Sequence, residues 1–235
     1  MFSIDMNLGG IYMKKNIMKA LTLSMLMLVA SNSINAQTKT DADLEASIQR
    51  GKQVAQVCVA CHGENFQGIV VSEDEVRPRL TGLNKDYLKH QIESFKNNSR
   101  ESIIMSPMAG ILDDAKAEDV FNYIASLPVI KDTKNINESL LAKGKKLVYE
   151  GDWDRNIPPC MGCHGLDAYG VGSTFPNING QSSEYIKAQI KSWKDGKRNN
   201  DTLHLMKTIA SYLEEDDINA VAAWLASQPA KRGEK

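Results

Sequence analysis

The sequence has 235 residues, of which 42% are hydrophobic and 24% charged, and its formal net charge is −1 at pH 7. This length and composition fit one or two globular domains and give no sign of disorder. The nearly balanced charge argues against a nucleic-acid-binding protein, which would need a basic surface.

The chain begins with the pattern of a secretory signal. Three lysines lie before a weakly polar to apolar run at residues 20–30, and small and polar residues follow up to Ala36. We expect residues 1–36 to be a signal peptide that directs export to the periplasm, with residues 1–12 as an upstream extension. The alternative is an uncleaved anchor helix. However, the run has about 11 residues, whereas a membrane-spanning helix needs about 20.

Loss of this leader would change the charge only slightly. It contains three of the 28 basic and one of the 29 acidic side chains, so the mature chain would carry 25 and 28, a net charge of −3. This mild charge predicts weak, salt-sensitive steering of charged protein partners. No second apolar run is long enough for a membrane span, so no stable span is expected after cleavage.

Further along the chain, all four cysteines lie in two short motifs, Cys58-Val-Ala-Cys61-His62 and Cys160-Met-Gly-Cys163-His164. The Cys-x-x-Cys-His spacing is the attachment signature of c-type haem. Two thiols one helical turn apart can add to the two vinyl groups of the porphyrin, and the adjacent imidazole can bind iron on one face. The sequence therefore predicts two covalently bound haem c groups, each with its iron.

Other uses of paired cysteines remain as alternatives. Two disulfides would suit an exported chain but would not require a histidine after each pair. A zinc site could use two such pairs, although these lie about 100 residues apart. A thioredoxin-like redox motif would follow a strand, whereas the flanks here predict helix.

The two motifs belong to a tandem repeat, which the order and spacing of three further segments support. These pairs are Pro78-Arg-Leu-Thr-Gly82 with Pro176-Asn-Ile-Asn-Gly180, Tyr87–Ile92 with Tyr185–Ile190, and Asp119–Pro128 with Ala220–Pro229. We therefore expect a first domain at residues 37–130, a linker at residues 131–139 and a second domain at residues 140–235.

Each domain is predicted to be all-α, a small helical bundle around one haem. Opening helices are expected at residues 41–57 and 140–150. Apolar stripes at helical spacing predict later helices whose stripes face a core: Tyr87, Leu88, Gln91, Ile92 and Phe95; Val120, Phe121, Ile124 and Leu127; and Tyr185, Ile186, Ile190 and Trp193. A domain of roughly 90 residues has a modest core, to which a buried macrocycle would add apolar surface.

These motifs resemble class I c-type cytochromes, and their tandem arrangement looks like the cytochrome c4 subfamily of periplasmic two-haem proteins. The resemblance implies haem attachment through Cys58, Cys61, Cys160 and Cys163, and iron ligation by His62 and Met105 in the first domain and by His164 and Met206 in the second. It also suggests that the carbonyls of Pro78 and Pro176 accept the Nδ1 proton of each histidine. Two segments depart from the pattern, Ile69–Val76 and Gly151–Pro159.

The choice of sixth ligand has competitors in both domains. Counting back from the shared C-terminal helix aligns Met105 with Met206 but Met108 with Ile209, which favours Met105. His204 could replace Met206 and give a bis-histidine haem of lower potential. His90 aligns with an alanine, and we expect it at the surface or an interface.

The expected function is that of an electron carrier without catalytic residues. Iron with both axial positions filled has no open site for a substrate, and His/Met ligation raises the reduction potential. The partners expected are redox proteins, a quinol-oxidising complex or dehydrogenase as donor and a terminal oxidase or reductase as acceptor. The alternatives are an electron-transfer subunit of a periplasmic dehydrogenase and, more remotely, a two-haem enzyme such as a thiosulfate dehydrogenase.

Overall fold

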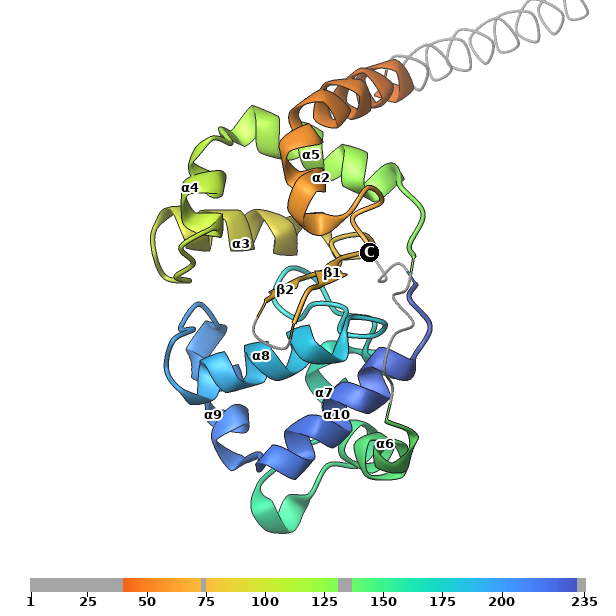
Figure 1. The fold of residues 1–235 in the computed structure, drawn as a ribbon, viewed down its shortest axis with the longest axis vertical. Helices are drawn as coiled ribbons and strands as arrows, with labels where there is room; N and C mark the ends of the chain where they lie inside the picture. The colour runs from red at the N-terminus through yellow and green to blue at the C-terminus, as the bar shows by residue number, and fades with distance from the viewer. Residues whose placement is uncertain (1–39, 73–74, 131–136, 232–235) are drawn as a thin grey trace, which may run out of the picture. The chain divides into compact units, whose positions relative to one another are not determined.

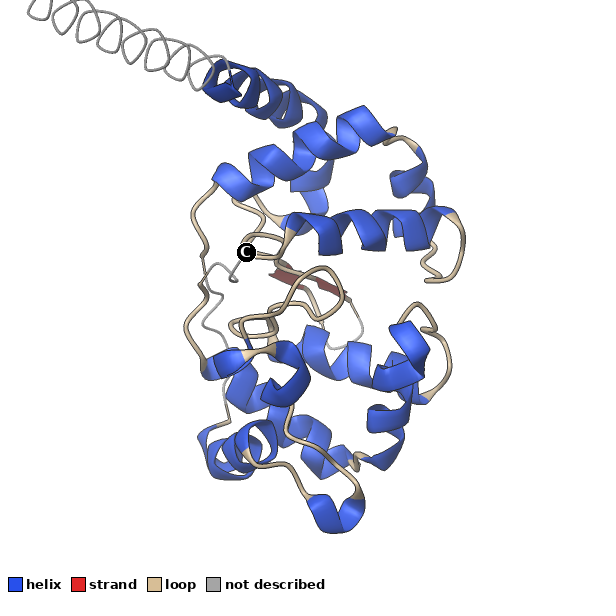
Figure 2. Ribbon diagram, turned by 180° about the vertical axis from the view of Figure 1, so that it is seen from behind, coloured by secondary structure: helices blue, strands red, loops and turns tan. Residues whose placement is uncertain are grey.

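The computed structural model describes residues 40–72, 75–130 and 137–231, so the predicted signal peptide and most of the predicted linker lie outside the described residues. Residues Ser47–Lys235 form one compact unit, which contains the first predicted domain from Ser47 onward and the whole second one, here called the first half and the second half. Helices account for most of the described residues, as predicted (Figures 1 and 2). None of the described helices is long and apolar enough to cross a membrane.

The first half follows the predicted order of helices, with one addition. Helical residues 47–54 lead through a turn at Ala55 into α2. The elements that follow are α2 (Gln56–His62), β1 (Ile69–Val70), β2 (Val76–Arg77), α3 (Lys85–Lys96), α4 (Met105–Gly110) and α5 (Asp114–Ser126).

The second half repeats this order without the strands. Its elements are η1 (Glu138–Leu140), α6 (Leu141–Tyr149), η2 (Trp153–Arg155), α7 (Met161–His164), η3 (Leu166–Ala168), α8 (Ser183–Lys194), η4 (Thr202–His204), α9 (Leu205–Tyr212) and α10 (Glu215–Ser227). The predicted opening helix at residues 140–150 corresponds to α6.

Equivalent residues start the equivalent helices α3 and α8. The Asn84 side chain accepts hydrogen bonds from the backbone N–H groups of Asp86 and Tyr87, and the Ser182 side chain accepts one from that of Tyr185. These short polar side chains satisfy N–H groups that have no partner within the helix. Of the predicted apolar stripes, Leu88 and Ile92 on α3 and Ile186, Ile190 and Trp193 on α8 pack in the cores.

The opening and closing helices of each half cross at a glycine. A Cβ added to Gly51 would lie 1.9 Å from the Asp119 carbonyl oxygen on α5, and one added to Gly144 would lie 2.0 Å from that of Ala220 on α10. Any side chain would therefore push the helices apart. Since Asp119 and Ala220 align in the repeat, the same crossing occurs in both halves.

Each half has its own apolar core, as expected for two repeated domains. The buried residues of the first core are Ala55, Phe66, Leu88, Leu112, Ala117, Val120, Phe121 and Ile124. Those of the second are Leu147, Val148, Ile157, Ala168, Ile186, Ile190, Ala210, Leu213, Ile218, Val221, Ala222 and Leu225.

The extra residues of the first half form a hairpin that helical periodicity does not predict. Ile69 pairs with Arg77 and Val70 with Val76 in antiparallel register. The hairpin lies between α3 and α8 in both ribbon views (Figures 1 and 2). It thus brings the segment that follows it, Pro78–Gly82, next to the second half.

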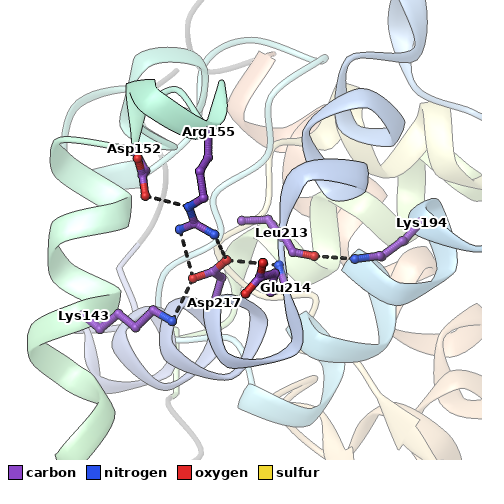
Figure 3. Close-up of polar contacts among 7 residues, drawn as sticks. All are labelled: Lys143, Asp152, Arg155, Lys194, Leu213, Glu214 and Asp217. Atoms are coloured by element: carbon purple, nitrogen blue, oxygen red, sulfur yellow. Dashed lines mark hydrogen bonds and ion pairs between the residues drawn. The ribbon is translucent and has the colours of Figure 1, made fainter.

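The extra segment of the second half is fixed by a buried carboxylate (Figure 3). Arg155 on η2 pairs with Asp152 at 2.7 Å and with Asp217 on α10 at 2.6 Å, and Lys143 on α6 pairs with Asp217 at 2.8 Å. Asp217 also accepts a hydrogen bond from the backbone N–H of Glu214 at the start of α10. This one side chain therefore joins α6, the extra segment and α10.

Candidate haem-binding sites

Each Cys-x-x-Cys-His motif lies on one short helix that ends at its histidine. Cys58, Cys61 and His62 lie on α2, whereas Cys160 precedes α7 and Cys163 lies within it. No disulfide joins the four cysteines, so each pair is available for haem attachment. Before attachment, burial would raise the pKa of the Cys58 thiol, and it would raise that of Cys160 to about 11.

The zinc alternative gains no support from the described residues. Within residues 40–72, 75–130 and 137–231, no three histidine, cysteine, aspartate or glutamate side chains come together as a metal-binding group. A four-ligand zinc site would need the two cysteine pairs side by side.

Both predicted ligand histidines are buried and make the predicted contact. The Nδ1 atom of His62 lies 3.0 Å from the carbonyl oxygen of Pro78, and that of His164 lies 2.8 Å from the carbonyl oxygen of Pro176. Burial lowers the pKa of both histidines, and the hydrogen bond to the proline carbonyl opposes it. A neutral imidazole that donates from Nδ1 keeps Nε2 unprotonated and available for iron.

The two methionines of the prediction occupy equivalent places. Met105 begins α4, and Met206 is the second residue of α9. Both are half-buried and line the same cavity as the histidines. Met108 also lines this cavity, so proximity alone does not choose between the two methionines of α4. The repeat favours Met105, because the residue of α9 equivalent to Met108 is Ile209, which cannot bind iron.

His204 is placed differently from Met206. It is exposed, with a left-handed backbone (φ 55°), at the end of η4. The described residues that line the cavity include Thr202, Leu205 and Met206 but not His204. The geometry therefore favours the methionine over the histidine.

The cavity between these groups has the size and chemistry that a haem requires. Its volume is about 1010 Å³, and it extends into both halves. All eight predicted cysteine, histidine and methionine residues line it, together with apolar side chains of the two cores such as Leu88, Phe121, Ile186 and Leu225. Thiols for attachment, imidazole and thioether for iron, and an apolar wall for the macrocycle are thus all present.

Two arginines lie where the halves meet along this cavity. The Arg100 guanidinium donates to Gln91 Oε1 (2.7 Å), Gln189 Oε1 (2.8 Å) and the Tyr185 hydroxyl (2.8 Å). Arg198 donates to Gln189 Oε1 (2.7 Å), Gln91 Oε1 (3.1 Å) and the Tyr87 hydroxyl at 3.4 Å. Each arginine thus contacts the glutamines of both halves and the tyrosine of the opposite half, and these residues are equivalent in the repeat.

These arginines suit the carboxylates of haem propionates. The pKa of Arg198 is lowered mainly by burial and further by the positive charge of Arg100. The two cations therefore share a site in which the described hydrogen-bond acceptors are neutral. Carboxylates would pair with them directly. Neither arginine was predicted from the sequence, and Tyr87 and Gln91 were predicted only as core positions, although both halves share the Tyr-x-x-x-Gln spacing.

His90 lies at the same interface, as expected. Its Nε2 atom is 3.1 Å from the carbonyl oxygen of Asn200, and the Asn200 side chain donates to Gln91 Oε1 at 2.9 Å. His90 therefore joins the two halves.

The comparisons with known proteins agree with this geometry. The cytochrome c family model matches residues 48–128 and again 141–229. A "Thiosulfate dehydrogenase electron acceptor" from Thiomonas intermedia is 42% identical over 74% of this chain and 80% of the relative. A cytochrome c4 from Thiocapsa roseopersicina is 32% identical over 72% of this chain and 85% of the relative.

Solved structures show the same likeness. Reduced cytochrome c4 from Pseudomonas stutzeri superposes with a TM-score of 0.68 at 27% identity, over 77% of this chain and 98% of that one. A thiosulfate dehydrogenase from Marichromatium purpuratum gives a TM-score of 0.69 at 31% identity, and the match covers 77% of this chain but 40% of that longer one. The chain belongs to the cytochrome c family, as a two-haem electron carrier of the cytochrome c4 type with two covalently bound haem c groups.

Proposed function

We propose that each half holds its haem with the residues described above. Cys58 and Cys61 attach the first haem, whose iron is bound by His62 and Met105. The equivalent residues of the second half are Cys160, Cys163, His164 and Met206. The haem supplies reversible one-electron chemistry at iron.

The protein's own residues fix the redox properties of that iron. The two proline carbonyls orient the histidines, the methionine thioethers would provide the second protein ligand of each iron, and the apolar cores exclude water. His/Met ligation and an apolar pocket both favour ferrous iron and raise the potential. With two protein ligands on each iron, the chain would carry electrons and have no catalytic site of its own.

The electron donor that we propose is a thiosulfate dehydrogenase in the periplasm. The observation that carries this is the likeness to the Thiomonas protein, whose name gives that role and which matches at 42% identity over most of both chains. A second relative of that name, from Stutzerimonas stutzeri, is 36% identical over 79% of its length. The Marichromatium enzyme supports the same pairing, since this fold forms part of that longer chain. The predicted signal peptide supports the location.

A second candidate is a general carrier between a quinol-oxidising complex and a terminal oxidase or reductase. The likeness to several cytochromes c4 favours it. The two candidates differ in the donor, whereas the haem sites are the same in both. A terminal oxidase or reductase remains the expected acceptor in either case.

The test uses the purified, oxidised holoprotein with thiosulfate. A catalytic amount of thiosulfate dehydrogenase should reduce both haems rapidly and saturably, whereas thiosulfate alone should reduce neither. A quinol with its oxidising complex is the parallel arm. Reduction in that arm and none by the dehydrogenase would favour the general carrier. Turnover of thiosulfate by the isolated protein would make it an enzyme.

A further inference from the structure

One peptide group links the iron-binding histidine of the first half to the second half. The carbonyl of the Pro78–Arg79 peptide accepts the hydrogen bond from His62 Nδ1 at 3.0 Å. The N–H of the same peptide donates to Gln181 Oε1 at 3.0 Å. Gln181 comes from the turn before α8, in the second half, and is 6% exposed.

Gln181 and Arg79 hold that peptide from both sides of the interface. The Gln181 side chain also donates through Nε2 to the Arg79 carbonyl at 3.1 Å. The Arg79 guanidinium donates hydrogen bonds to two carbonyls of the second half, those of Asn179 at 2.6 Å and Gly180 at 3.3 Å. It also donates to the carbonyl of Thr81 in its own half. Burial lowers the pKa of Arg79 to about 10, so it remains a cation at neutral pH.

The repeat shows that this contact runs in one direction. Aligning Pro78 with Pro176 places Asn177 at the position of Arg79 and Leu83 at the position of Gln181. Leu83 has no side-chain polar atom, so the first half cannot hold the Pro176–Asn177 peptide in the same way. Asn177 Nδ2 lies 3.4 Å from the Gly82 carbonyl oxygen of the first half and 2.8 Å from that of Lys231.

We propose that Gln181 is a positioning residue through which the second half tunes the reduction potential of the first haem. The proposal rests on the ligation by His62 proposed above. An acceptor on the N–H of a peptide polarises that peptide and makes its carbonyl a stronger acceptor. A stronger hydrogen bond from Nδ1 makes the imidazole a more basic ligand. A more basic ligand stabilises ferric iron, so Gln181 lowers the potential of the first haem and leaves the second unaffected.

The experiment replaces Gln181 in the two-haem holoprotein. Gln181→Leu copies the residue that the repeat has at this place and removes the polarising acceptor. It should raise the potential of the first haem, leave that of the second unchanged, and speed exchange of the His62 Nδ1 proton with deuterated water. Gln181→Glu keeps an acceptor and adds negative charge, so it should lower the first potential. Redox titration followed by NMR, in which contacts with each half assign the haem resonances, measures both potentials.

Asn177→Leu is the comparison variant at the equivalent position, because it removes the hydrogen bonds from Nδ2 to the carbonyls of Gly82, across the same interface, and of Lys231. It should not raise the first potential. A purely structural role for Gln181 would shift both potentials in the leucine variant, or would shift the first one in the same direction in the leucine and glutamate variants. Either result, or unchanged potentials, would overturn the proposal. If the leucine variant does not fold, the glutamate variant and the proton-exchange rate decide.

Failure of the proposed function looks different from failure of this inference. If the proposed function is wrong, the unmutated protein will lack haem or will not be reduced by thiosulfate dehydrogenase. If only the role of Gln181 is wrong, the variants will hold two low-spin haems but their reduction potentials will not shift as predicted.

Discussion

Arg100 and Arg198 lie opposite each other in an antiparallel bridge, and each donates hydrogen bonds to both Gln91 and Gln189. Both cations line the cavity where the two halves meet, so they should destabilise ferric iron in both halves. Arg100→Leu should therefore lower both reduction potentials. A charge acting over about 10 Å at an effective dielectric constant of about 20 gives a shift of roughly 70 mV for a one-electron couple.

Spectroelectrochemical titration measures this effect. Lys96→Leu, at the exposed end of α3, provides the control for charge alone and should leave the potentials nearly unchanged. Equal shifts in the two variants would show that the interface arginines have no special influence on the haems.

Haem content tests the roles of the cysteines. The wild-type protein should contain two covalent haems per chain, and Cys58→Ser with Cys61→Ser should leave one, held by the second half. A pyridine haemochrome assay with protein quantitation gives the ratio. Haem that acid acetone extracts from the wild type would contradict covalent attachment.

The methionine assignment predicts a clear difference between neighbours on α4. Met105→Ala should abolish the sulfur-to-iron charge-transfer band of one haem and lower its potential, because a thioether ligand favours ferrous iron. Met108→Leu should leave both nearly unchanged, since this side chain is assigned to packing. The reverse pattern would refute the assignment.

The equivalent change in the second half tests His204. Met206→Ala should remove the charge-transfer band of the other haem, whereas His204→Ala should not. A full two-haem band in Met206→Ala would show that His204 binds iron instead.

Asp217 should make the second half sensitive to acid. Burial raises the pKa of its carboxyl, but hydrogen bonds from Arg155 and Lys143 outweigh burial and hold the pKa below its usual range. A depressed pKa stabilises the fold above the unfolded-state pKa of about 4, and this stability is lost as pH falls through the folded-state value. Asp217→Asn should cost about 1–3 kcal/mol of unfolding free energy at pH 7, and the difference should shrink below about pH 4.

Denaturant unfolding at several pH values checks this. Asp195→Asn is the control, because Asp195 forms a 3.5 Å ion pair with Lys197 at an exposed site and such pairs contribute little. A loss that is as large for Asp195→Asn, or that does not change with pH, would contradict the role of Asp217.

The sequence predicted the parts of the site that depend on local spacing. The contact between His62 and Pro78, which the family resemblance implied, joins residues that are close along the chain, and both halves repeat it. The β1–β2 hairpin was not predicted, because its strands are too short for a periodic signal. Arg79 and Gln181 were not predicted either, since their contacts join residues about 100 positions apart and depend on how the two halves pack.

Held by these residues, the two haems should store two electrons per chain, and both should be low-spin without an open coordination position. A coulometric redox titration of the holoprotein, with spectra recorded in both oxidation states and carbon monoxide added to the reduced form, measures this. We predict uptake of two electrons per chain, low-spin spectra throughout and no binding of carbon monoxide. Uptake of a single electron, or a high-spin haem that binds carbon monoxide, would contradict two-haem electron storage by this chain.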